Sequence, residues 1–93
     1  MVEKIIWRKR ALYRLEKLLP YLTEEFGEKV AETFLERLNT ELELISEFPE
    51  LGPKHPTKNQ HLRVMHRLTS IIYKITSNQL IVLDIWDNRR KPK

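Results

Sequence analysis

Two stretches of the chain carry apolar residues at helical spacing. The first stretch comprises Ala11, Leu15, Leu18 and Leu22. The second comprises Val30, Phe34, Leu38, Leu42 and Ile45. Because such positions share one face of a helix, both stretches are predicted to form amphipathic helices that bury these residues. Pro20 removes a backbone donor from the first helix, which predicts a kink or an early end near Leu19 and a stop by Gly27.

The rest of the chain has the character of strands and one long loop. Residues 48–60 contain prolines and Gly52, which is loop composition. The segments predicted to be strands are 2–7, 62–67, 69–76 and 80–87, of which 62–67 is short and alternates poorly. The short connection at Gly27 predicts an antiparallel helical hairpin. The expected fold is therefore α+β, a single domain over residues 1–93 of order β-α-α-β-β-β, with the hairpin on one face of a small, mainly antiparallel sheet.

Alternation along the strands predicts which side chains share a face. If Leu62 and Val64 point to the core, then His61, Arg63 and Arg67 lie together on the exposed face. On the last strand we expect Ile81, Leu83 and Ile85 to face the helices. The opposite face then carries Leu80, Val82, Asp84 and Trp86. This is more apolar surface than a solvated face should show, which predicts that a partner covers it.

Composition narrows the class of protein. The chain has 93 residues, 41% of them apolar and 32% charged, which is typical of a soluble globular domain. It contains no cysteine, which excludes disulfides, thiolate metal sites and cysteine nucleophiles. We find no apolar run long enough for a membrane span and no secretory signal, so a cytoplasmic protein without membrane contact is expected. No cofactor signature or metal-ligand spacing occurs, so neither a cofactor nor a metal is predicted.

Charge is segregated along the chain. Residues 1–17 carry a net charge of +4, residues 18–53 carry −7 and residues 54–93 carry +7, which sums to the total of +4. Solubility alone would not require this separation. It predicts a basic surface that attracts a polyanionic or acidic partner.

The ordered set of short sequence features resembles the RelE/ParE superfamily of toxins from type II toxin–antitoxin systems. These features are the opening Ile-Ile-Trp-Arg-Lys-Arg-Ala-Leu, the helix end Glu-Glu-Phe-Gly, the turn Phe-Pro-Glu-Leu-Gly, the pair Leu-Arg, the strand Ile-Ile-Tyr-Lys-Ile and the late run Trp-Asp-Asn-Arg-Arg-Lys-Pro. The resemblance implies a growth-inhibiting toxin, of the kind linked to plasmid stabilisation, that is neutralised by a cognate acidic antitoxin.

The superfamily has two mechanisms, and the resemblance bears on both. RelE-like members are ribosome-dependent mRNA endoribonucleases, whose chemistry needs a proton acceptor, a proton donor and cations around the phosphate. Arg63 matches a basic position of that branch, and Arg89 or Arg90 lies near its late arginine. However, Ser70 replaces an arginine, and no tyrosine or histidine follows Asp87. Arginine is a poor proton shuttle.

The likeness is therefore closer to the ParE-like branch, which implies binding to DNA gyrase without catalysis. The alternatives left open are an endoribonuclease acting on mRNA at the ribosome through His61, Arg63 and Arg89, or an inactive relative that only forms an antitoxin complex. Whether the chain is an enzyme thus stays open at this point.

The candidate residues divide into two sets. Contacts to the target or to phosphate are predicted for Arg63, Arg67, Arg89 and Arg90. Contacts to the antitoxin are predicted for Leu80, Val82 and Trp86, because the antitoxin is expected to supply an amphipathic, acidic segment along the hairpin and the sheet. The plainer interpretation of the arginines is a solvated surface that keeps a small domain soluble.

Overall fold

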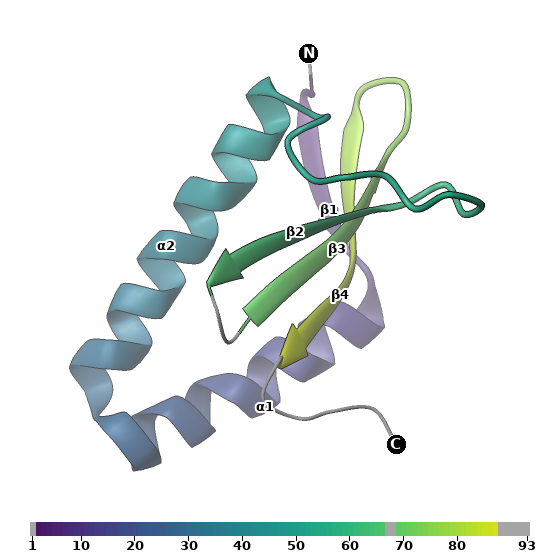
Figure 1. The fold of residues 1–93 in the computed structure, drawn as a ribbon. Coiled ribbons are helices and arrows are strands. Elements are labelled where there is room, and N and C mark those ends of the chain that lie inside the picture. The colour runs from purple at the N-terminus through teal and green to yellow at the C-terminus, as the bar shows by residue number, and fades with distance from the viewer. Residues whose placement is uncertain (1, 67–68, 88–93) are drawn as a thin grey trace.

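A computed structural model describes residues 2–66 and 69–87, except for the side chain of residue 66. The elements in chain order are β1 (Lys4–Trp7), α1 (Lys9–Phe26), α2 (Glu28–Glu47), β2 (His61–His66), β3 (Thr69–Ile75) and β4 (Gln79–Asp87). The sheet has the order β1-β4-β3-β2 (Figure 1). The three later strands form an antiparallel meander, and β1 adds to β4 in parallel. The α+β fold and its element order are confirmed, and the sheet is mixed.

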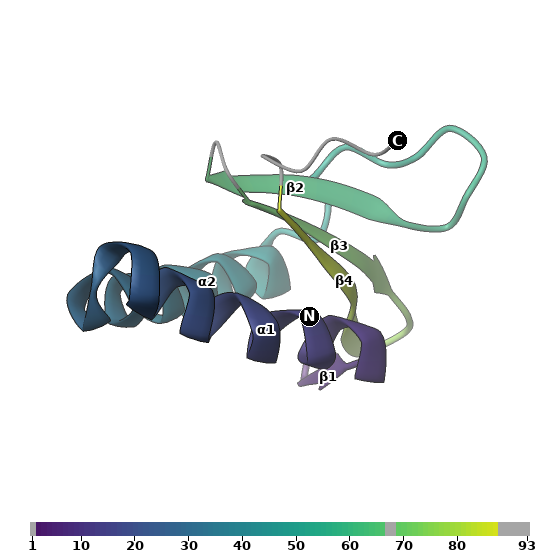
Figure 2. The same cartoon turned by 90° about the horizontal axis from the view of Figure 1, so that it is seen from below.

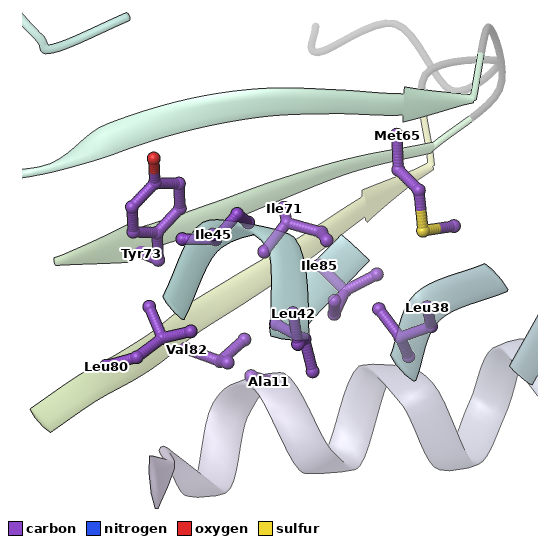
Figure 3. Packing of buried hydrophobic residues seen from close by; sticks show 10 residues of the cluster. All are labelled: Ala11, Leu38, Leu42, Ile45, Met65, Ile71, Tyr73, Leu80, Val82 and Ile85. Atoms are coloured by element: carbon purple, nitrogen blue, oxygen red, sulfur yellow. The ribbon is translucent and has the colours of Figure 1, made fainter. Parts of the chain in front are cut away.

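Both helices lie on one side of the sheet (Figure 2). They diverge from Gly27 in a V, with α1 across the end of β4 and α2 along the other arm (Figure 1). The core between the layers is closed by Leu38, Leu42 and Ile45 of α2 and by Ala11 of α1 (Figure 3). Val30 of the predicted stripe is 43% exposed, so its predicted burial is wrong. Burying a large aliphatic side chain contributes about 1.5–3 kcal/mol, so the buried part of the predicted helical stripes accounts for much of the stability.

Helix α1 does not end at Pro20. It continues to Phe26, so the expected early end near Leu19 is wrong, whereas the stop at Gly27 is confirmed. The Thr23 hydroxyl donates to the Leu19 carbonyl at 3.0 Å, and the Gly27 N–H donates to the Thr23 carbonyl at 2.9 Å. Gly27 has φ +95°, a conformation that glycine adopts without steric cost, which lets the chain turn directly into α2.

Strand β2 presents the opposite faces from those predicted. His61 pairs with Tyr73 and Arg63 with Ile71, which places both on the inner, helix-facing side of the sheet together with buried Met65. Leu62 and Val64 point to the outer face, where Val64 is 54% exposed. The inner row is favoured because Met65 fills the core next to α2 and the charged Arg63 finds a partner at the rim.

The alternation of β4 changes at a β-bulge. Ile72 pairs with Asp84 and the next residue, Tyr73, pairs with Val82, so Leu83 is the extra residue. Before the bulge, Leu80 and Val82 point into the core and are fully buried; after it, Ile85 does so. The prediction that Leu80 and Val82 face outward is therefore wrong. Ile85 faces the helices as expected, and Asp84 and Trp86 lie on the outer face.

Candidate functional site: a basic groove beside α1

A groove of about 1160 Å³ lies between α1 and the second half of β4, and its lining includes the outer-face residues Ile72, Asp84 and Trp86. We call it the α1 groove. Its helical wall consists of Arg10, Tyr13, Arg14, Lys17, Leu18 and Tyr21. Its other walls consist of Lys58, Gln60, Ile72 and residues 83–87. The polar helical residues recur at helical spacing, and the bulge at Leu83 turns Asp84 and Trp86 toward them.

Asp84 forms the floor of the groove. Although it is charged, it is only 8% exposed. Its carboxylate lies 3.6 Å from Arg10 Nε and 3.3 Å from Arg14 Nε. It also accepts hydrogen bonds from the Ile85 N–H at 2.9 Å and from Trp86 Nε1 at 3.1 Å. A buried carboxylate is tolerated when its oxygens are satisfied in this way, so Asp84 ties α1, β4 and the Trp86 ring together.

Aromatic rings flank the cations. Trp86 is 42% exposed and Tyr13 59% exposed. The Lys17 ammonium lies 5.3 Å from the centre of the Tyr13 ring, within the range of a cation–π contact. The groove therefore offers both positive charge and flat apolar surface to a partner.

A second hollow of about 520 Å³ continues the basic surface. It shares Arg10, Gln60 and Leu83 with the α1 groove and adds Arg8 and Lys9. The two hollows together are lined by the cations Arg8, Lys9, Arg10, Arg14, Lys17 and Lys58. Against these stand Asp84 and Asp87, which leaves a net charge of 6 − 2 = +4 on the described lining.

The charged residues at the two ends of α1 destabilise this helix through its dipole. The first turn of α1 holds no acidic residue and its last turn no basic one. Instead Lys9 and Arg10 lie at the positive end of the helix dipole, and Glu24 and Glu25 at the negative end. Each such charge costs about 0.3–1 kcal/mol relative to the reverse order. The helix dipole therefore does not explain Lys9 and Arg10 in the first turn, although Arg10 pairs with Asp84.

The structure separates His61 from this groove. His61 is buried on the inner side of the sheet, where its ring stacks on Tyr73 with centroids 5.0 Å apart. Its Nδ1 lies 2.7 Å from the Gly52 carbonyl oxygen. The Tyr73 hydroxyl accepts a hydrogen bond from the Gly52 N–H at 2.9 Å and donates one to the Pro49 carbonyl at 2.8 Å. The expectation that His61 shares an exposed basic face is wrong, since these contacts hold the 49–52 turn against the sheet.

Arg63 is likewise on the inner side, at the rim. Its Nε donates to Glu41 of α2 at 2.9 Å, and this hydrogen bond raises the pKa of the Arg63 guanidinium. Neighbouring Arg37 of α2 donates to the Met65 carbonyl at 2.9 Å. The exposed placement predicted for Arg63 is therefore wrong, and its role toward a target stays a prediction.

The remaining candidates have different outcomes. Arg67, Arg89 and Arg90 lie outside the described residues. Trp86 is on the outer face, as expected, and belongs to the α1 groove. Sequence reasoning missed Arg10, Arg14 and Lys17 as site residues, although their spacing along one side of the helix was a usable signal. Asp84 gave no such signal, because its ion pairs depend on the bulge.

The chemistry available in the groove is binding of anions and flat rings. Among the described residues no group of three or more acidic or histidine side chains is arranged to hold a metal ion. The groove lining supplies arginine and lysine, which hold phosphate or carboxylate but shuttle protons poorly at neutral pH. None of the described helices is both long and apolar enough to cross a bilayer.

The solved structures that share this fold include the following three. One is described as the chromosomal ParDE TA system from P. aeruginosa, with a TM-score of 0.75, 13% identity, and coverage of 94% of this chain and 96% of that chain. The YoeB dimer from Staphylococcus aureus has a TM-score of 0.66 and 12% identity, and the match covers 92% of this chain and 97% of that chain. The YoeB/ParE toxin from Agrobacterium tumefaciens has a TM-score of 0.61 and 16% identity, and the match covers 91% of this chain and 98% of that chain. All three have the same overall fold as this chain.

The family follows from the sequence. The family model for the ParE toxin of the type II toxin–antitoxin system parDE matches residues 5–92. The chain therefore belongs to the ParE toxin family, and the resemblance drawn from its short motifs is confirmed. A comparison with curated protein sequences gives no match.

Proposed function

We propose that this protein is a growth-inhibiting toxin that acts by binding DNA gyrase and is neutralised by a cognate acidic antitoxin. The observation that carries this proposal is the α1 groove, a cationic and aromatic surface whose described lining contains no histidine. His61, the residue expected to move protons in an endoribonuclease, is buried on the other side of the sheet. Family membership supports the toxin class.

The groove also suits the proposed antitoxin. Ile72 and Leu83 provide apolar contacts, and Arg10, Arg14 and Lys17 line the facing wall. An amphipathic segment with acidic residues on one side would satisfy both surfaces at once, and charge complementarity would speed its association. A segment of this kind often folds as it binds. The antitoxin would then block the same surface that meets the target.

The decisive experiment compares two readouts in cells that express the toxin. Plasmid supercoiling, together with a supercoiling assay on purified gyrase, reports gyrase inhibition. Primer extension on cellular mRNA reports cleavage. Loss of supercoiling with intact mRNA is the expected result, and codon-phased cleavage with unchanged supercoiling would contradict it. Retention of normal growth by a stably folded chain would instead indicate an inactive relative.

A further inference from the structure

The α1 groove combines two features that proteins use to hold single-stranded nucleic acid. One is a track of cations that can follow a phosphate backbone, here Arg10, Arg14, Lys17 and Lys58. The other is a set of aromatic rings on which bases stack, here the exposed Tyr13 and Trp86. Because both features line one hollow, phosphates and bases of the same strand can be held together.

The arginines are held in position for an anion. Both approach Asp84 through Nε, at 3.6 Å for Arg10 and 3.3 Å for Arg14. Their side chains nevertheless remain 71% and 43% exposed, respectively. Asp84 thus attracts the Nε side of each guanidinium while much of the side chain faces solvent. A guanidinium whose conformations are restricted in this way loses less side-chain freedom when it binds phosphate.

Trp86 is fixed by the same carboxylate. Its indole N–H donates to Asp84 at 3.1 Å, so the ring is oriented rather than free to rotate. A base stacked on an oriented ring loses less freedom on binding than one on a mobile ring. In a duplex the base faces are already stacked on each other, so this surface favours a single strand.

We propose that the α1 groove of the free toxin binds single-stranded DNA, with phosphates on Arg10, Arg14 and Lys17 and bases stacked on Tyr13 and Trp86. This inference rests on the proposed function for the choice of DNA over RNA, because the proposed target acts on DNA. The binding itself requires neither gyrase nor antitoxin. An acidic antitoxin segment would compete for the groove by presenting a similar array of negative charge.

The test is fluorescence anisotropy of a labelled oligothymidylate titrated with the full-length protein at several salt concentrations. Single-strand binding weakens with salt with a slope of about −0.7 per phosphate contacted, so three contacts predict a slope near −2. Replacing Lys17 by Gln should make the slope shallower by about 0.7. Trp86→Leu should weaken binding about tenfold with the slope unchanged, because it removes stacking and no charge.

Matched controls exclude general charge and folding effects. Lys4→Gln and Lys29→Gln each remove one exposed cation outside the groove and should leave the slope unchanged. Neither Lys17 nor Tyr13 contacts Asp84 in the ion-pair cluster, so Lys17→Gln and Tyr13→Leu test the site without disturbing that cluster. Circular dichroism and urea unfolding confirm that each variant is folded.

Several results would overturn the inference. These are no binding at low salt, equal effects of the groove and control variants, tighter binding of duplex than of single strand, or a matched RNA strand preferred more than tenfold. Displacement by polyglutamate with no dependence on Trp86 would identify an acidic-peptide site instead. Inhibition of gyrase without strand binding would contradict this inference alone, whereas strand binding without any effect on gyrase would contradict the proposed function alone.

Discussion

At the scale of single residues, Asp84 decides the shape of the groove. It is a nearly buried carboxylate whose partners come from two elements, α1 and β4. Hydrogen bonds to a charged group contribute about 1.5–3 kcal/mol each when well formed, and less where one partner is exposed. The side chain is therefore both a stabilising contact and a positioning group.

Asp84→Asn should lower the free energy of unfolding by about 1–2 kcal/mol, because the amide retains an acceptor but loses the charge that attracts both arginines. Urea unfolding at low ionic strength measures this difference. The control is Glu43→Gln, which removes a charge from the exposed surface of α2 and should shift stability by less than about 0.5 kcal/mol. Equal midpoints for the two variants would show that the Asp84 cluster does not stabilise the fold.

Tyr73 links the sheet to the 49–52 turn, and its titration should be visible in the stability of the protein. Burial raises the pKa of the Tyr73 hydroxyl above its ordinary value of 10.0, although the Gly52 N–H opposes this effect. A raised pKa in the folded state means that the folded chain retains the proton which the unfolded chain releases. This contribution to stability is therefore complete below about pH 10 and is lost as pH rises through the folded-state pKa.

Tyr73→Phe should cost about 1–3 kcal/mol at neutral pH, because the Gly52 N–H and Pro49 carbonyl lose their partner. Above pH 10 the gap between wild type and variant should narrow, since only the wild type has this hydroxyl to ionise. Urea midpoints measured from pH 7 to pH 11 test both statements. The control is Tyr13→Phe at an exposed tyrosine, whose urea midpoints should differ from those of the wild type by the same amount at every pH. If the difference in urea midpoint between the wild type and Tyr73→Phe stayed constant with pH, ionisation of the Tyr73 hydroxyl would not contribute to stability.

At the scale of elements, Pro20 is an unfavourable residue in the interior of helix α1. Helix α1 continues through it, although proline lacks the N–H that would bond to the residue four positions earlier. Pro20→Ala should therefore stabilise the protein by about 1–3 kcal/mol. In a domain of this size, each kcal/mol raises the melting temperature by about 4–8 °C. The control is Glu16→Ala, which exchanges one good helix former for another at an exposed position and should change the melting temperature little. A lower melting temperature for Pro20→Ala would contradict the prediction, because it would mean that proline fits this position better than alanine.

The contact between β2 and α2 depends on the pair Arg63 and Glu41. Glu41 has a side chain only 12% exposed, so removing Arg63 leaves a carboxylate that is poorly solvated. A double-mutant cycle with Arg63→Met and Glu41→Leu should give two destabilised single variants and a double variant less destabilised than their sum, with a coupling of about 1 kcal/mol. Additive effects would rule out this coupling.

The same cycle tests the predicted target role of Arg63 when growth arrest is measured. If Arg63 acts only through the fold, Arg63→Met loses toxicity and the double variant regains it. If Arg63 contacts the target, both variants lose toxicity although the double variant is the more stable. Comparing toxicity with soluble protein level separates these outcomes.

Helices could be predicted from the sequence more fully than strand faces, and particular residues show why. Leu38, Leu42 and Ile45 are buried as their spacing predicts, because helical period is a local property. Leu80 and Val82 were assigned to the wrong face because the bulge at Leu83 changes the alternation, and no local signal marks it. His61 and Arg63 were misplaced because both faces of β2 alternate poorly, so tertiary contacts with Gly52 and Glu41 decide the outcome.

At the scale of the whole molecule, charge is segregated between segments of the chain. The helical region from residue 18 to 53 carries −7, while the first segment, which supplies the cations of the α1 wall, carries +4, and residues 54–93 add a further +7. Oppositely charged regions orient a small protein as it approaches a charged partner and raise the association rate, and salt weakens this effect. The segregation seen in the sequence predicted a basic surface on β2 and the C-terminal run, whereas the basic groove of the described residues is lined mainly by cations of α1.

This charge segregation gives a test of the proposed target. Arg10→Gln combined with Arg14→Gln removes two cations from the groove and should raise the toxin concentration needed for half-inhibition of gyrase supercoiling about tenfold, since each exposed charge pair contributes about 0.5–1 kcal/mol. In the double variant Asp84 keeps only its hydrogen bonds from the Ile85 N–H and Trp86 Nε1. Adding Asp84→Asn removes this unpaired charge, and urea unfolding of the double and triple variants separates a fold defect from a loss of binding. Lys4→Gln with Lys29→Gln carries the same change in net charge outside the groove and should inhibit like the wild type. If both double variants lose inhibition equally, net charge and not the groove governs the encounter with gyrase.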